Sequence, residues 1–284
     1  MNPITHPQTN KQVQNFIKQP AHGLGLTGLP GSGKQYLARY LAQKITKNSQ
    51  TSSPYTKEVI AGEDGIDAIR EVQKFLHLKV PGTESIRRVV VIANAEDFRH
   101  EAQNALLKTL EEPPEDTLLV LTTSDISGLL PTVRSRLQWV EVKPISADQA
   151  LKEFAHGYKS DEIKKAWLIS QGCAGLMAGL LEHDTKHPLV ASVDQARALL
   201  QASAYQRISK VDSLVKDKDF SLDLLLDGMN RLLYTALQVA IKKGSSQKEI
   251  ARLKDQVKLV LMSQKYAKGK VQPKLLLTNL FYSL

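Results

Sequence analysis

The sequence predicts an α/β domain built on a parallel sheet, followed by two regions made of helices alone. Short runs of Val, Ile and Leu without polar alternation are typical of parallel strands covered on both faces, and amphipathic stretches separate these runs. A glycine-rich loop directly follows the first run, and apolar residues recur at helical spacing beyond residue 143. The predicted strands are residues 23–27, a short piece at 59–60, 89–93 and 118–122.

Helix-start signals mark the region after the α/β domain. Ser146-Ala-Asp-Gln149 has the spacing of a capping box, and the apolar residues that follow it recur with helical periodicity. Ser160 is expected to cap a further helix, and residues 183–188, which include His-Pro, interrupt the helical pattern. Only helices are predicted from there to the end of the chain. We therefore expect three domains, at residues 1–143, 144–187 and 188–284.

Composition restricts the class of protein. Hydrophobic residues make up 42% and charged residues 24% of the 284 residues, as in ordinary globular proteins. No apolar run reaches the roughly 18 residues that a membrane span needs, and the N-terminus lacks the features of a signal peptide. The one cysteine, Cys173, excludes an internal disulfide and a multi-cysteine zinc site. We therefore expect a cytoplasmic protein that does not contact a membrane.

The net charge of +9 is concentrated near the C-terminus. Residues 242–274 hold ten Lys or Arg against two acidic residues, Glu249 and Asp255, so this segment supplies eight of the nine surplus charges. Such a basic face favours binding to nucleic acid or to an acidic partner. The alternative is a solvated helix face, because an apolar stripe lies opposite it. That stripe is Ile250, Leu253, Val257 and Val260.

The glycine-rich loop, Gly-Leu-Pro-Gly-Ser-Gly-Lys at residues 28–34, lies between a predicted strand and a helix expected at residues 35–45. Glycines let backbone N–H groups surround a phosphate, the helix N-terminus adds its dipole, and the lysine adds a point charge. The next residue should be Ser or Thr to coordinate Mg²⁺, but it is a glutamine. The candidate nucleotide-binding residues are Gly28, Gly31, Ser32, Gly33, Lys34 and Gln35.

The strand at residues 89–93 lacks the carboxylates of a nucleotide hydrolase. Such a strand should end in an Asp that holds Mg²⁺ and a Glu that activates water, but Ala93 and Asn94 occupy these places. Glu96 and Asp97 follow a few residues later, where we expect them to begin a helix, since acidic side chains suit its N-terminus. Hydrolysis of ATP by the chain itself is therefore not expected.

Several motifs together resemble a known family: His6-Pro-Gln, residues 28–34, residues 104–114 and residues 130–136, with weaker matches at 171–178 and 274–281. The motif at 130–136 ends in Ser135-Arg136, which is followed by Leu137 where the family has cysteine. On these residues the chain is similar to the delta-prime family of bacterial DNA polymerase III clamp-loader subunits, within the AAA+ superfamily. The resemblance spans nearly the full chain, and its C-terminal part rests mainly on helical pattern.

The resemblance implies an AAA+ nucleotide-binding-type domain, a small helical lid and a helical collar that joins a pentameric loader. It also implies a rigid, non-hydrolysing subunit that presents Arg136 as an arginine finger, in trans, to the ATP of a neighbouring motor subunit. A guanidinium can neutralise the charge on a transferring phosphoryl group. Without the resemblance, an ordinary surface ion pair of Arg136 or Arg134 is the alternative. The implied partners are gamma/tau motor subunits and delta and, through the complex, the sliding clamp and primed DNA.

Two further positions agree with a subunit that does not hydrolyse ATP. The lid segment at residues 172–178 has Leu176 and Met177 where active relatives carry a nucleotide-sensing arginine. Thr123 falls near the first sensor position of the family, at the end of a predicted strand. A threonine can orient a water molecule. However, Ala93 and Asn94 beside it supply no carboxylate to hold a metal ion, so no metal-dependent hydrolysis is expected there for Thr123 to assist.

No metal or obligatory cofactor is expected. Many relatives carry a four-cysteine zinc module where this chain has a polar, turn-prone connector at residues 47–54. The seven histidines are scattered and lack metal-ligand spacing. ATP or ADP binding at residues 28–34 is left open, because the loop motif is intact. Two other functions also stay open: an active motor ATPase of the gamma/tau kind, and a free-standing DNA-binding AAA+ protein recruited through its basic collar.

Overall fold

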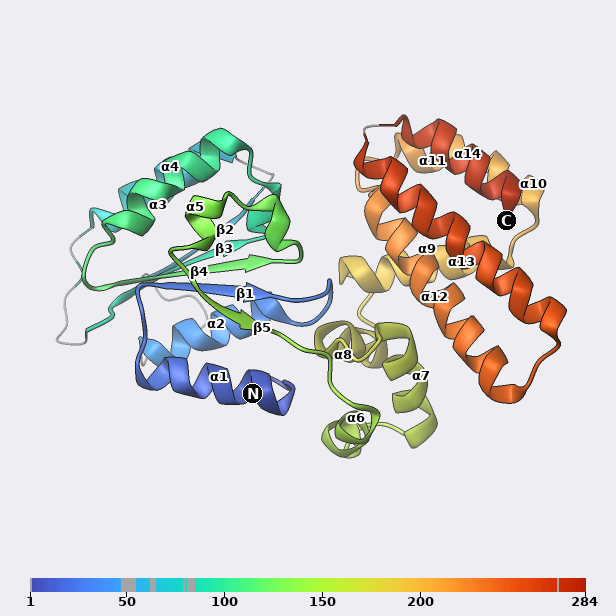
Figure 1. The fold of residues 1–284 in the computed structure, drawn as a ribbon, viewed down its shortest axis with the longest axis horizontal. Coiled ribbons are helices and arrows are strands. Elements are labelled where there is room, and N and C mark those ends of the chain that lie inside the picture. The colour runs from blue at the N-terminus through green and yellow to red at the C-terminus, as the bar shows by residue number, and fades with distance from the viewer. Residues whose placement is uncertain (1, 47–54, 62–64, 79, 81–84, 270) are drawn as a thin grey trace. The chain divides into compact units, whose positions relative to one another are not determined.

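The computed structural model describes residues 2–46, 55–61, 65–78, 80, 85–269 and 271–284 (Figure 1). The chain forms two compact units. The first consists of Met1–Glu153 together with Cys173–Gly175, and the second of Phe154–Gly172 and Leu176–Leu284. The connector predicted at residues 47–54 and Lys270 of the basic segment lie outside the described residues. The finer division into three domains stays a prediction.

The first unit contains a five-stranded parallel sheet in the order β2-β3-β4-β1-β5, which confirms the predicted α/β class. The four predicted strands are present, and the central ones are buried along almost their whole length. A fifth strand, β5, was not predicted. The bounds are β1 Gly23–Thr27, β2 Thr56–Ile60, β3 Arg88–Ala93, β4 Thr117–Thr123 and β5 Gln138–Glu141.

Helices cover both faces of this sheet (Figure 1). On one face α1 (Pro7–Lys18) and α2 (Lys34–Ile45) pack apolar residues against β1, β3 and β4. On the other, α3 (Gly65–Leu76) and α4 (His100–Glu111) cover the alternate side chains of β3 and β4. This arrangement explains why these strands are apolar without alternation. Shorter elements are η1 Ala95–Asp97, η2 Ile126–Gly128, α5 Pro131–Arg134 and α6 Ala147–Phe154.

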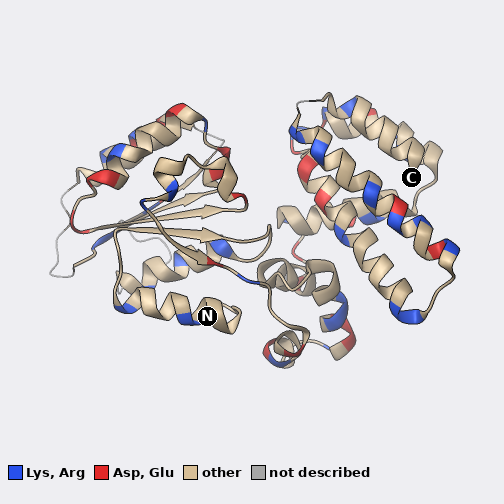
Figure 2. Cartoon of the chain, viewed as in Figure 1, with Lys and Arg blue, Asp and Glu red and all other residues tan. Residues whose placement is uncertain are grey.

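Every secondary-structure element in the described part of the second unit is a helix, as the sequence predicts. Its long helices α12 and α13 form an antiparallel hairpin, and Figure 2 shows Lys and Arg along α13 and at the turn that joins the two. Buried Leu, Val and Phe side chains of α9 and of α11 to α14 form its core. The bounds are α7 Ser160–Ser170, α8 Ala174–Glu182, α9 Pro188–Gln201, α10 Ala204–Ser209, α11 Val211–Lys216, α12 Leu222–Lys243, α13 Gln247–Lys268 and α14 Pro273–Ser283.

Two predicted helix caps differ from the structure in part. The Ser146 hydroxyl accepts a hydrogen bond from Gln149 N at 3.2 Å, as expected, but the Gln149 amide donates to the Thr5 carbonyl instead of closing a capping box. Ser160 is the first residue of α7 and not its cap. The Glu162 carboxylate accepts from Lys159 N at 3.0 Å and thereby satisfies the amide that precedes the helix.

Side chains of α12 tie α7 to the rest of the second unit. Arg231 is 3% exposed, donates from Nη1 to the Ser170 carbonyl at 3.0 Å, and pairs with Asp227 at 2.6 Å. The Thr235 hydroxyl donates to the Leu168 carbonyl at 3.1 Å. These bonds supply donors to carbonyls in the last turn of α7, although the Leu168 carbonyl also accepts from Gln171 N at 3.3 Å.

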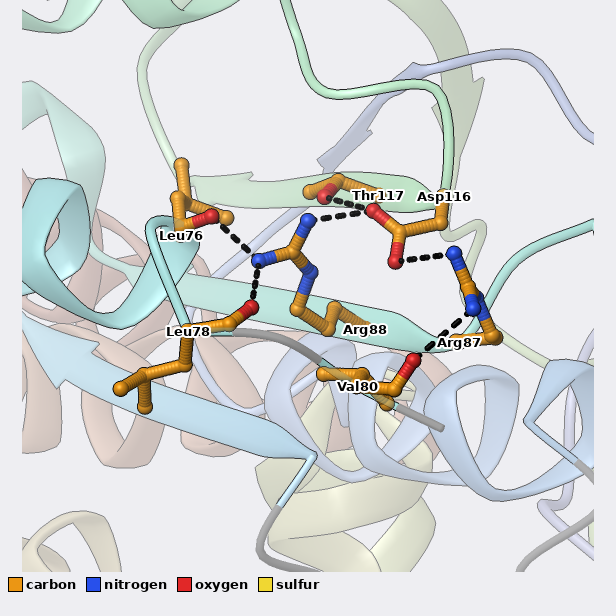
Figure 3. Close-up of polar contacts among 7 residues, drawn as sticks. All are labelled: Leu76, Leu78, Val80, Arg87, Arg88, Asp116 and Thr117. Atoms are coloured by element: carbon orange, nitrogen blue, oxygen red, sulfur yellow. Dashed lines mark hydrogen bonds and ion pairs between the residues drawn. The ribbon is translucent and has the colours of Figure 1, made fainter. Parts of the chain in front are cut away.

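A buried ion-pair network fixes the amino-terminal edge of the sheet (Figure 3). Arg88, at the start of β3, donates to the carbonyls of Leu76 and Leu78 and pairs with Asp116, just before β4. Arg87 pairs with the other oxygen of Asp116 at 3.0 Å. Burial alone would raise the pKa of Asp116, but the Arg88 hydrogen bond and the two arginine charges together hold it below its usual value. The network anchors the end of α3 to two neighbouring strands.

No helix in the described part of the chain is long and apolar enough to cross a membrane.

Candidate nucleotide-loop and arginine sites

The loop at residues 28–34 lies at the carboxyl end of β1, where ligands bind in parallel α/β sheets. Gly28 N donates to the Thr123 carbonyl at 3.3 Å and joins the loop to the end of β4. Gly31 and Gly33 have φ values of 81° and 92°, a conformation that favours glycine. Ser32 is buried, and among the described residues its hydroxyl has no hydrogen-bond partner. The sequence motif therefore forms the turn that it predicts.

Lys34 is directed at its own loop. Its Nζ donates to the Gly28 carbonyl at 2.7 Å, to the Leu29 carbonyl at 3.0 Å and to the Ser124 hydroxyl at 3.1 Å. Three acceptors match the three protons of an ammonium group. The side chain is 7% exposed, and its burial lowers the pKa of Lys34 from 10.5 to about 8, although the nearby Glu96 charge opposes this shift.

The backbone of residues 173–175 packs against the same loop. A Cβ atom at Gly175 would stand 2.9 Å from the Gly31 carbonyl oxygen and 3.0 Å from the nitrogen of Gly33. A side chain at Gly175 would therefore collide with the loop. The amide of Gly33 belongs to the set of N–H groups that would surround a phosphate, and this segment is seated against it.

Gln35 is turned away from the loop. Its Nε2 donates to Glu58 of β2 at 2.5 Å, and Arg39 of the same helix pairs with Glu58 at 2.8 Å. The side chain that replaces a Mg²⁺-coordinating Ser or Thr is thus engaged with the edge of the sheet.

The end of β3 has no carboxylate at either of its two expected places. Ala93 is buried, and Asn94 has a φ of 53° with its N–H bonded to the Thr122 hydroxyl at 3.2 Å. Glu96 and Asp97 lie in the short helix η1, as predicted. Glu96 nevertheless stays at this end of the sheet, because its Oε1 accepts from Ser124 N at 2.7 Å and its charge acts on Lys34. The Thr123 hydroxyl accepts from Asp125 N at 3.0 Å.

Arg136 lies at the opposite end of the sheet. Its carbonyl oxygen is 3.0 Å from where a Cβ at Gly23, the first residue of β1, would stand, whereas the phosphate loop follows Thr27, the last. Four steps of a parallel strand place these ends about 13 Å apart. The guanidinium makes a surface ion pair with Glu111 at 2.5 Å and donates to the Thr132 carbonyl at 2.8 Å. About a third of this side chain is exposed.

Sequence reasoning missed Gln103, an amide in the apolar stretch of α4. It is 2% exposed, donates to the carbonyls of Phe98 and Gly128 at 3.0 Å, and accepts from Leu130 N at 2.7 Å. It therefore fixes the segment before α5 and, through it, the position of Arg136. A glutamine at a helix position where apolar neighbours predict burial was the available signal. Among the described residues, no three His, Cys, Asp or Glu side chains gather as a metal site.

A phosphate loop at the carboxyl edge of a five-stranded parallel sheet, followed by a helical region, defines an AAA+ type of P-loop protein. A family model described as "DNA polymerase III, delta subunit" matches residues 5–146, half of the chain. The chain therefore belongs to the DNA polymerase III delta-subunit family. The predicted resemblance to delta-prime and other clamp-loader proteins is confirmed at this level.

Individual relatives agree with the family assignment. The chain is 34% identical over 230 residues to DNA polymerase III subunit delta′ of Escherichia coli, covering 72% of the chain and 65% of that protein. It is 29% identical over 187 residues to DNA polymerase III subunit gamma of Buchnera aphidicola, covering 57% of the chain and 51% of the relative. The chain thus spans less than two thirds of the length of these curated relatives.

A solved structure supports the fold. The gamma subunit-related protein of DNA polymerase III from Thermotoga maritima superimposes with a TM-score of 0.60 at 21% identity, covering 97% of this chain and 98% of that one.

Proposed function

We propose that the chain is a non-hydrolysing clamp-loader subunit that assembles with gamma/tau motor subunits and delta and helps to load the sliding clamp onto primed DNA. In this role Arg136 acts in trans on the ATP of a neighbouring subunit. One observation carries the proposal: Arg136 stands at the far end of β1 from the loop of its own chain. A guanidinium in that position cannot serve a phosphate bound at residues 28–34.

The state of the chain's own loop supports the absence of hydrolysis in cis. Lys34 is bonded to loop carbonyls and Gln35 to Glu58, so neither side chain is directed at a phosphate or a metal ion. Ala93 and Asn94 supply no carboxylate at the end of β3. We expect the loop to act as a structural turn, with ATP or ADP binding weak or absent, and we expect no metal requirement.

The ion pair of Arg136 with Glu111 is compatible with a role in trans. The two side chains are 33% and 47% exposed, and exposed ion pairs contribute at most about 1 kcal/mol. A nucleoside triphosphate on a neighbouring subunit carries several negative charges. It can displace the Glu111 carboxylate from Arg136, because breaking that ion pair costs at most about 1 kcal/mol. An arginine finger accelerates hydrolysis by a factor on the order of 10³ or more, so the exchange is favourable in the transition state.

The finger is tested in a reconstituted loader that contains Arg136→Ala. We expect normal assembly by size-exclusion chromatography and a large decrease in DNA-stimulated ATP turnover. The decrease should be less than a factor of about 10³ if other sites in the ring continue to hydrolyse ATP. Arg134→Ala is the matched control, because it removes the same charge two residues away and should leave turnover near the wild-type rate. Unchanged turnover in Arg136→Ala rejects the finger.

The active-motor alternative is tested with the purified chain alone. We expect no ATP turnover by the wild type. Robust turnover that is lost in Lys34→Ala would assign a catalytic role to Glu96 or Asp97 and replace the proposal with a motor function. Binding of ATP is measured in the same samples by calorimetry.

A further inference from the structure

Helix α13 carries a line of lysines on its exposed side. Lys254, Lys258 and Lys265 are spaced by four and seven residues, which places them on one face of a helix. All three are exposed, and none makes an ion pair with any residue that the structure describes. Leu261 lies in the same line and is 43% exposed. Figure 2 shows the positive charge along this helix.

This face differs from an ordinary solvated one. Of the predicted apolar stripe, the helix buries Val257 and Val260, whereas Ile250 and Leu253 are half-buried. Ser263, which was not part of the predicted stripe, is buried as well. A solvated helix face usually mixes charges of both signs, with acidic residues three or four positions from the lysines. Asp255 lies three positions before Lys258 but makes no ion pair with it in the described structure, and no acidic residue occurs in α13 after Asp255. All charged residues in the second half of the helix are therefore lysines.

An apolar stripe adjoins the lysines. Met262 and Tyr266 are four residues apart and therefore share a face, and they are 41% and 56% exposed. Met262 is also four residues from Lys258, so the apolar stripe begins beside the lysines on the helix surface. An exposed aromatic ring beside unpaired ammonium groups is the combination by which proteins hold single-stranded nucleic acid, since the ring stacks on a base and the cations bind phosphates.

We propose that this face of α13 binds a single nucleic-acid strand. Lys254, Lys258 and Lys265 contact successive parts of the phosphate backbone, and Tyr266 stacks on an unpaired base. The strand is bound without sequence preference, because neither contact reads a base edge. Binding is a property of the chain itself and does not depend on the proposed role of Arg136.

The test is fluorescence anisotropy of a labelled oligothymidine with the full-length chain over a range of salt concentrations. Each phosphate contact to a single strand contributes about 0.7 to the slope of log affinity against log salt. Three contacts therefore predict a slope of about −2.1 from this surface, and Lys258→Gln/Lys265→Gln should reduce the magnitude of the measured slope by about 1.4. The matched control is Lys164→Gln/Lys165→Gln, which makes the same charge change on exposed residues of α7.

Tyr266→Ala separates stacking from charge. It should weaken oligothymidine binding on the order of tenfold and leave the salt slope unchanged. Circular dichroism checks that the variants, all at exposed positions, remain folded. The proposal is overturned if the wild type does not bind the oligonucleotide, or if the α13 and α7 double variants change the slope equally. It is also overturned if polyglutamate, added at the same total negative charge, competes with the oligonucleotide for the chain. An unaffected Tyr266→Ala overturns the stacking contact.

Discussion

The shifted pKa of Lys34 predicts how the stability of the α/β unit depends on pH. In the folded chain the pKa of Lys34 is about 8, against 10.5 for an ordinary lysine. Between these values the unfolded chain binds more protons, so the free energy of unfolding rises with pH. At about 1.36 kcal/mol for each pKa unit, the rise from this group is about 3 kcal/mol. The variant Lys34→Met has no group to titrate and should lack this rise.

The measurement is urea unfolding at pH 7 and pH 10.5 in a Trp167→Phe background. Trp139 of β5 then reports on the first unit alone, because the chain has two tryptophans. The quantity of interest is the difference in unfolding free energy between wild type and Lys34→Met, compared at the two pH values. This double difference removes the titration of all other groups. Lys44→Met, at an exposed lysine of the same helix, is the matched control.

Parallel stability profiles of wild type and Lys34→Met from pH 7 to pH 10.5 would refute the reasoning. They would mean that the Lys34 ammonium is solvated, or held by an anion, and not buried on its own loop. The result also bears on nucleotide binding. A lysine that loses its proton near pH 8 is a poor phosphate ligand at that pH, so saturating ATP should not increase the stability of the chain by mass action.

Three substitutions test the contacts that hold each unit together. Asp116→Asn leaves buried Arg88 without its carboxylate and should cost about 3–5 kcal/mol in urea unfolding. Because the pKa of Asp116 is lowered, the wild type should also lose more stability than the variant as pH falls through that pKa. Gly175→Ala should lower the melting temperature through its collision with Gly31, at about 1–3 kcal/mol. Arg231→Leu should speed hydrogen exchange at the end of α7, which loses a carbonyl partner; unchanged exchange would contradict this.

The fold could be predicted where burial is uniform along an element. The strands β3 and β4 are buried at every residue, and their continuous Val, Ile and Leu runs have no other common explanation. Strand β5 was missed because it is a four-residue edge strand, with Gln138 and Glu141 exposed and only Val140 fully buried. This segment forms a strand because it pairs with β1 and contacts α1. The Thr9 hydroxyl of α1 donates a hydrogen bond to the Glu141 carbonyl at 2.7 Å. No local pattern encodes such a partner.

In the candidate site, too, the features set by neighbouring residues could be predicted, whereas contacts between residues far apart in the sequence could not. Seven consecutive residues predict the phosphate loop, because glycine conformations and the strand-to-helix context are local properties. What Lys34 contacts was not predictable, since Ser124 lies 90 residues away in the sequence. The segment around Gly175, which packs against the loop, is more distant still. The missing carboxylates indicated a loss of catalysis, but only the fold shows the loop bonded to its own lysine.

Strand β1 separates the phosphate loop from Arg136. The phosphate loop follows its last residue, and the backbone of Arg136 lies beside its first, Gly23. A strand is a rigid spacer, so no rotation of side chains brings the guanidinium and Lys34 to one phosphate. A second subunit must supply the nucleotide if Arg136 is to act on one. The loop also has a structural role, because its turn leads directly into α2, which covers β1 and β3.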